Sequence, residues 1–258
     1  MAEDTPIKPA ATILLVRDQP AFEVLMVKRH HQIDFASGAL VFPGGKLHQG
    51  DLDSDWADHA IGWAATPADQ RPLRIAAIRE VYEEAGMLLA RDRAGAVFHG
   101  DERMGPAREA VARDERDFID LVAELGVKID LEALVPFARW ITPALMPKRF
   151  DTWFYLALAN SEQLAQCDGW ETVDAEWIAP AEAIRLAALG ERKVIFPTRM
   201  NLQLLAEASS GADAIARAKA RPLVTVEPKV QPRDGGPVLV IPADAGYGEV
   251  AEPLSAVG

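Results

Sequence analysis

Hydrophobic and polar positions in this chain form two kinds of pattern. Short, mostly apolar runs, typical of buried strands, fall at residues 10–17, 22–29, 39–42, 134–141, 151–159 and 171–178. Longer stretches with apolar positions at helical spacing fall at residues 72–90, 107–125, 181–189, 199–208 and 212–220. The chain is therefore expected to combine strands and helices, with turn residues between them.

The predicted helix over residues 72–90 has two contrasting sides. Glu80, Glu83 and Glu84 are related as i, i+3 and i+4, so they share one side. The apolar positions share the other: Ile75, Ile78, Tyr82, Ala85 and Leu89. Carboxylates at this spacing repel one another by about 0.2–0.5 kcal/mol per pair. The stripe is either a solvated acidic face or a site for a cation such as Mg²⁺ or Mn²⁺, which prefer carboxylate oxygens.

A glycine turn precedes this helix. Residues 40–42 are the end of an apolar run, and Pro43, Gly44, Gly45 and Lys46 follow directly. Glycine lets the backbone approach a ligand closely, so the Gly45 carbonyl is a candidate to join a metal shell.

These two segments resemble the signature of the Nudix hydrolase family. That signature runs Gly, five residues, Glu, seven residues, then Arg-Glu-apolar-x-Glu-Glu-x-Gly-apolar, and residues 79–87 fit its second half at every specified position. Five residues separate Gly45 from Asp51, which stands in place of Glu, and 27 residues separate Asp51 from Arg79 in place of seven. The additional residues are expected to form a loop, which is tolerable because closure entropy grows only with the logarithm of loop length.

The resemblance covers residues 10–208 and implies an α/β (α+β) fold, a Nudix-type α/β/α sandwich with a mixed β-sheet between helices. The expected domain spans residues 10–221, with an insertion at 52–70 and an extra helix at 107–125. Residues 1–9 are expected to be a flexible N-terminus. Residues 222–258 are rich in proline and are expected to form a hairpin or an extended arm, which can pair with a neighbour.

The resemblance also implies hydrolysis of a diphosphate linked to another moiety, with Mg²⁺ or Mn²⁺ as cofactor. Glu80 and Glu84 would bind metal together with the Gly45 carbonyl. Glu83 would be either a further ligand or the base, and Arg79 would orient the carboxylates. A non-catalytic Nudix-fold binding module is the contrasting hypothesis, supported only by Asp51 and the long insertion.

Two further segments, residues 140–143 and 149–155, resemble the Nudix motif 19-type proteins, which are coenzyme A diphosphatase-like. This favours CoA or acyl-CoA as substrate. The extended CoA-associated signature of other CoA-cleaving Nudix enzymes is not recognisable before Phe42, so ADP-ribose or a dinucleotide such as NADH stays an alternative.

Lys148 and Arg149 stand out as adjacent bases in the predicted loop 142–150, beside an aromatic strand. They are candidate phosphate contacts, because a charge-assisted bond to phosphate suits both side chains. Ordinary solvated basic residues are the alternative. Likewise, the segment with His30, His31 and Asp34 is interpreted as a polar loop or a substrate contact, and no third and fourth zinc ligand stands at finger spacing.

Charge and cysteine content limit the binding partners and the cellular compartment expected for the protein. The net charge of −12 disfavours nucleic acid and anionic membranes as partners. Cys167 is the only cysteine, so no intramolecular disulfide is expected. No run of about 18 apolar residues exists, and the first residues lack the apolar core of a signal peptide. A cytoplasmic protein acting on a small-molecule diphosphate is expected, and a homodimer is compatible with it.

Overall fold

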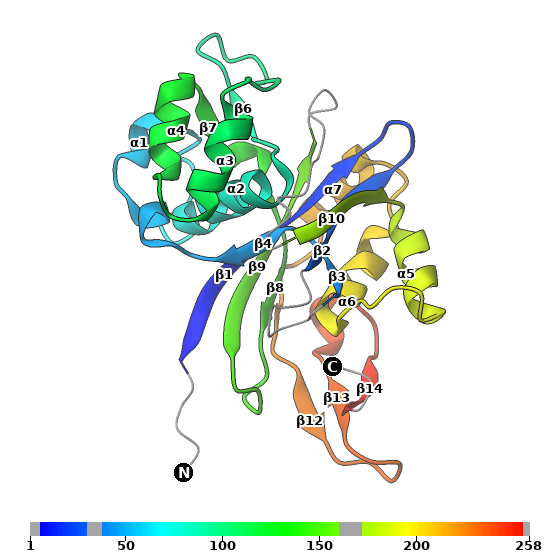
Figure 1. Ribbon diagram of the computed structural model, residues 1–258. Helices are drawn as coiled ribbons and strands as arrows, with labels where there is room; N and C mark the ends of the chain where they lie inside the picture. Colours follow the sequence, from blue (N-terminus) through cyan, green and yellow to red (C-terminus); the bar gives the residue numbers. More distant parts are fainter. Residues whose placement is uncertain (1–5, 30–37, 160–171, 255–258) are drawn as a thin grey trace.

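The computed structural model describes residues 6–29, 38–159 and 172–254. Its centre is a β-sheet with helices on both faces (Figure 1). Buried side chains form one large cluster on each face of the sheet. The predicted α/β/α sandwich is therefore confirmed. Residues 30–37, with His30, His31 and Asp34, and residues 160–171, with Cys167, lie outside the described residues, so the predictions for them are not addressed.

The sheet is mixed, as expected. Its strand order is β10-β2-β1-β9-β8-β11, and two short strands, β3 and β4, pair with β2 and β1. The β1–β9 and β8–β11 pairs are parallel and the others are antiparallel. The strands are β1 (Ile7–Arg17), β2 (Glu23–Arg29), β3 (Leu40–Val41), β4 (Gly44–Lys46), β8 (Val135–Ile141), β9 (Arg149–Leu158), β10 (Thr172–Ile178) and β11 (Thr225–Val226).

Helix α2 (Arg71–Ala85) packs against β1 and β4 on the first face. Around it lies a lobe formed by residues 52–70 and 90–133, which we call the inserted lobe (Figure 1). Its elements are α1 (Trp56–His59), β5 (Ala60–Ile61), β6 (Ala90–Arg91), α3 (Met104–Ala112), α4 (Phe118–Leu125), β7 (Lys128–Asp130) and the 3-10 turn η2 (Leu131–Ala133). Strand β7 pairs with β5 on one side and with β6 on the other. The insertion is thus joined to a later segment rather than forming a separate loop.

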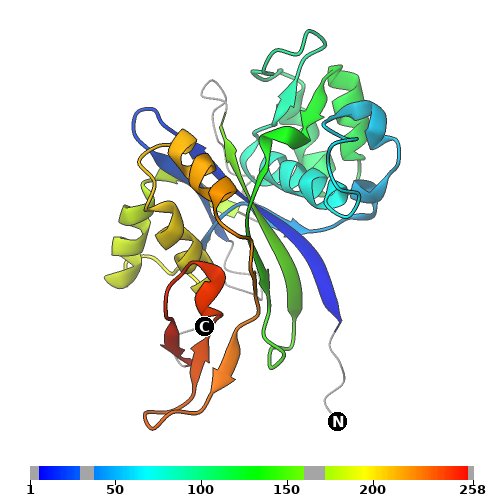
Figure 2. The ribbon, with the colours of Figure 1, turned by 180° about the vertical axis from the view of Figure 1, so that it is seen from behind.

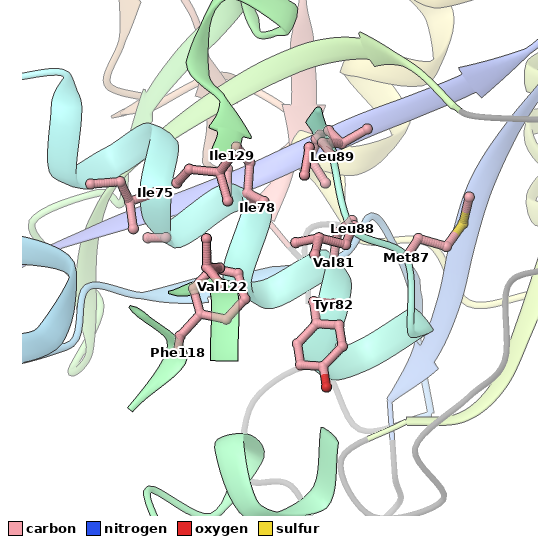
Figure 3. Close-up of a cluster of buried hydrophobic side chains, with 14 of the residues drawn as sticks. Ile75, Ile78, Val81, Tyr82, Met87, Leu88, Leu89, Phe118, Val122 and Ile129 are labelled. Carbon is pink, nitrogen blue, oxygen red and sulfur yellow. The ribbon is translucent and has the colours of Figure 1, made fainter. Parts of the chain in front are cut away.

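The apolar side of α2 is buried by the inserted lobe. Figure 3 shows Ile78, Val81 and Tyr82 of α2 close to Phe118 and Val122 of α4. Tyr82 and Phe118 stack with ring centroids 5.8 Å apart. A lobe that supplies such contacts stabilises α2, because apolar burial contributes about 25 cal/mol per Å².

Two predicted helix boundaries were wrong. The helix expected over residues 72–90 ends at Ala85, because Gly86 adopts the left-handed conformation (φ 71°) that commonly ends helices. Residues 87–89 are still buried, which explains why their apolar character extended the pattern. The helix expected over residues 107–125 is two helices, α3 and α4. Asp114 stands between them at φ 55°, a conformation that aspartate tolerates better than most residues.

The second face is covered by α5 (Pro180–Ala188), α6 (Phe196–Leu205), α7 (Gly211–Ala220) and the C-terminal segment (Figure 2). That segment has the strands β12 (Lys229–Gln231), β13 (Val238–Val240) and β14 (Ala251–Pro253), which form a small antiparallel sheet. Its Tyr247 accepts a hydrogen bond from Trp140 Nε1 at 3.1 Å and donates one to Asn201 at 2.8 Å. The segment therefore packs on its own chain.

None of the helices in the described ranges combines the length and the apolar character that crossing a bilayer requires.

Candidate active site

The acidic side of α2 is buried, not solvated. Glu80, Glu83 and Glu84 expose only 5, 8 and 3% of their surface, Arg79 exposes 3% and Asp51 exposes 2%. Burying four carboxylates costs free energy unless they are paired or bind a cation. A solvated acidic face is therefore excluded, and each buried carboxylate needs a partner.

Arg79 is the centre of the cluster. Its Nε and Nη2 donate to the two oxygens of Asp51 at 2.9 and 3.1 Å, and its Nη1 lies 3.0 Å from both oxygens of Glu83. The same Nη1 forms an ion pair with Glu80 Oε1 at 3.0 Å, and Nη2 donates to the Lys46 carbonyl at 2.9 Å. One guanidinium thus links the turn after β4 to the helix.

Asp51 reaches Arg79 from a short 3-10 turn, η1 (Gln49–Leu52). Its Oδ2 also accepts the His48 backbone N–H at 2.8 Å, which holds the carboxylate in place. Trp56, at the start of the insertion, donates from Nε1 to the Gly50 carbonyl at 2.9 Å and anchors the same turn. The shorter aspartate side chain therefore makes a complete two-point contact with Arg79.

The glycine turn touches two of the glutamates. The Gly44 N–H donates to Glu84 Oε2 at 3.0 Å. A Cβ atom on Gly45 would overlap with Glu80 Oε1, so a side chain at this position would displace that carboxylate. Close approach of backbone to carboxylate is thus the physical reason for glycine here.

The cluster has more negative than positive charge, since one guanidinium faces four carboxyl groups. Burial raises the pKa of Glu83 to about 8, against the opposing effect of Arg79 and with a further rise from Glu80. Burial by itself would lower the pKa of Arg79, but Glu80 and Asp51 raise it overall above its usual range. A divalent cation would relieve this excess of negative charge.

Oxygen donors suit Mg²⁺ and Mn²⁺, so the residues present fit such an ion. Within the described ranges, however, no three His, Cys, Asp or Glu side chains are grouped as a preformed metal site. The carboxylates instead face Arg79 and the glycine turn. A cation would therefore compete with Arg79 for Glu80 and Glu83, and Glu84 would keep one oxygen for the Gly44 N–H.

Lys148 and Arg149 are not brought to this cluster. The predicted loop 142–150 ends at Lys148, and Arg149 begins β9. Arg149 is buried, donates to the Thr142 carbonyl at 3.0 Å and pairs with Glu227 at 2.8 Å. In β1, Ile7 is opposite Arg149 and Thr12 is opposite Gly44, a separation of about 16 Å along the strand. Lys148 is exposed.

Two contacts at the last turn of α2 were not predicted from the sequence. Arg108 of α3 donates from Nε to the Glu83 carbonyl at 2.7 Å. Tyr82, next to Glu83, donates to the Met104 carbonyl at 2.7 Å. No motif or spacing signals these contacts, because both partners come from the separate helix α3.

Comparisons with known proteins show which family this chain resembles. A family model described as the NUDT19 Nudix domain matches residues 58–200. Acyl-coenzyme A diphosphatase NUDT19 of Xenopus laevis is 28% identical over 205 residues, which cover 63% of this chain and 54% of that protein. The protein of the same name from Gallus gallus is 30% identical over 234 residues, covering 69% of this chain and 62% of that protein.

The chain thus spans between 54 and 62% of the length of these two curated relatives. The crystal structure of a NUDIX hydrolase from Alicyclobacillus acidocaldarius is similar to it with a TM-score of 0.73 and 28% identity, over 83% of this chain and 97% of that one. The family model matches more than half of the chain, and the signature helix is built as described above. The chain therefore belongs to the Nudix hydrolase family, in the group of the NUDT19 type.

Proposed function

We propose that this protein hydrolyses the diphosphate bond of a nucleoside diphosphate linked to another moiety, with CoA or acyl-CoA as the favoured substrate. The observation that carries the reaction class is the buried cluster of Glu80, Glu83 and Glu84 around Arg79, which has too little positive charge to balance it. The substrate is supported by the relatives named acyl-coenzyme A diphosphatase.

In this proposal Glu80, Glu83, Glu84 and the Gly45 carbonyl would hold Mg²⁺ or Mn²⁺. The ion, when bound, neutralises diphosphate charge and lowers the pKa of a coordinated water. Arg79 and Asp51 keep the helix and the glycine turn at a constant separation. Glu83, whose pKa burial raises to about 8, also suits the alternative role of taking a proton from the attacking water.

Cation binding can be tested without substrate. An ion that binds only the folded state adds about 2.7 kcal/mol of stability at 100 times its Kd. We expect the Tm of the EDTA-treated protein to rise across tenfold steps of Mg²⁺ or Mn²⁺. The rise should be lost in the double variant Glu80→Gln/Glu84→Gln. An equal rise in that variant would place the ion elsewhere.

The activity test is a substrate screen with product identification by mass. We expect CoA or acyl-CoA to give 3′,5′-ADP and a phosphopantetheine product, only with Mg²⁺ or Mn²⁺. Faster turnover of ADP-ribose or NADH would show that the substrate is ADP-ribose or a dinucleotide and not CoA. Binding of a diphosphate compound without turnover, under every metal condition, would favour the binding-module hypothesis.

The proposal also includes a cytoplasmic location, no nucleic-acid partner and no membrane partner. It is supported by the net charge of −12 and by the single cysteine. Fluorescence microscopy of the tagged protein checks the location, and sedimentation of the purified protein checks the homodimer. Secretion into the medium would contradict this part.

A further inference from the structure

The last turn of α2 has an unfavourable charge distribution. It carries Glu83 and Glu84 and has no basic residue of its own. The C-terminal end of a helix has a partial negative charge, and its last carbonyls lack partners within the helix. Carboxylates are therefore disfavoured at the end of the helix where the candidate site needs them. A cation from elsewhere in the chain would offset this.

Arg108 supplies that cation from α3. Its Nε donates to the Glu83 carbonyl at 2.7 Å. Its guanidinium also lies against Gly86, since a Cβ on Gly86 would be 3.3 Å from Arg108 Nη1. Gly86 closes the helix with a hydrogen bond from its N–H to the Tyr82 carbonyl at 2.8 Å. The side chain thus covers the helix end at the residue that ends it.

A second contact from the inserted lobe holds the same turn. The Tyr82 hydroxyl donates to the Met104 carbonyl at the start of α3, and its ring stacks on Phe118 of α4 (Figure 3). Tyr82 and Glu83 are adjacent, so two consecutive residues of the last turn of α2 are hydrogen-bonded to the inserted lobe. Any displacement of α3 would be transmitted to the carboxylates.

We propose that Arg108 is a positioning residue for Glu83 and Glu84, and that the inserted lobe acts on the active site through it. The inference rests on the proposed function for its kinetic readout. By satisfying a terminal carbonyl and placing positive charge at the helix end, Arg108 keeps the last turn helical. Without it the turn frays, and the two carboxylates leave the position that binding the cation requires.

The experiment compares Arg108→Ala and Arg108→Lys with Arg113→Ala as a matched control. Arg113 is an exposed arginine at the end of the same helix and pairs with Glu109. We expect Arg108→Ala to lower kcat about 10-fold with KM within twofold, because small misplacements of catalytic groups have effects of this order. Arg108→Lys should restore part of the loss, and Arg113→Ala should resemble the wild type.

Amide hydrogen exchange provides a readout that does not depend on turnover. In Arg108→Ala we expect faster exchange at residues 83–87 and a smaller Tm rise on adding Mn²⁺, with exchange in β1 and β9 unchanged. These two results would support the inference even if no substrate were turned over. Unchanged exchange at residues 83–87 would overturn it. So would a uniform increase in exchange across the domain, since that would mean general destabilisation.

Discussion

Arg79 and Asp51, 28 positions apart in the chain, form a two-point ion pair with N–O distances of 2.9 and 3.1 Å. The long segment between them folds into α1, β5 and the start of α2 and returns the chain to the same place. The two halves of the signature are therefore in direct contact, although the insertion separates them in the sequence.

Asp51→Ala removes one partner of this buried pair. Arg79 keeps Glu80 and Glu83 but loses its two-point contact, and breaking a buried pair costs about 3–5 kcal/mol. We expect a loss near the lower end of that range in urea unfolding, together with reduced activity. Asp53→Ala, at an exposed position nearby, is the control and should change stability little. Equal stability of the two variants would mean that the Asp51–Arg79 pair does not stabilise the folded protein.

Gly45→Ala tests the close approach of the glycine turn to Glu80. The added Cβ would overlap with Glu80 Oε1, so the carboxylate must move. The stability cost should be about 1 kcal/mol, at the low end for overpacking, because a side-chain end can shift. The activity should fall at least about 10-fold. Gly50→Ala is the matched control, since a Cβ added at Gly50 would face open space. Equal activities would contradict this role of Gly45.

Glu83→Gln and Glu84→Gln test the proposed catalytic roles. Glutamine keeps the size of the side chain, and at position 84 it can still accept the Gly44 N–H. Each variant should therefore stay folded and lose at least about 100-fold in kcat, the range expected for a group that handles protons or metal. Circular dichroism checks the fold and the product assay checks kcat. Turnover near the wild-type rate in both variants would refute the assignment.

The raised pKa of Glu83 predicts a pH dependence of stability. A carboxyl whose pKa is raised to about 8 on folding adds stability at pH values below its unfolded pKa and loses that contribution as pH rises through about 8. We expect the Tm of the EDTA-treated protein to fall between about pH 5 and about pH 9, and to fall less in Glu83→Gln. Parallel pH profiles of the two proteins would show that Glu83 does not contribute.

Arg149 contacts Thr142 and Glu227 of its own chain, so its replacement is expected to affect stability. Because it pairs with Glu227 and donates to Thr142, Arg149→Ala should lower stability by about 1–3 kcal/mol and affect CoA and dephospho-CoA alike. Glu227→Ala, which removes the partner of Arg149, should also lower the free energy of unfolding. A KM increase confined to CoA, which has a 3′-phosphate that dephospho-CoA lacks, would instead support the phosphate contact expected for Arg149 from the sequence.

Local geometry made part of the active site predictable from the sequence. Glu80, Glu83 and Glu84 share one side of α2 because the period of a helix places them there. Arg79 lies in the same short stretch of chain, next to Glu80. The apolar runs likewise predicted the main strands, since buried strands need them whatever their partners.

Tertiary structure alone decided the rest, because it depends on residues that are distant in the chain. The spacing of the glutamates left a solvated face open, and only packing of α2 against the glycine turn and the inserted lobe buries them. The sequence does not show that Arg149 pairs with Glu227, since the two residues are 78 positions apart. The contact of Arg108 with Glu83 has no local signal at all, since a hydrogen bond between two helices depends on how they pack and not on the sequence of either one.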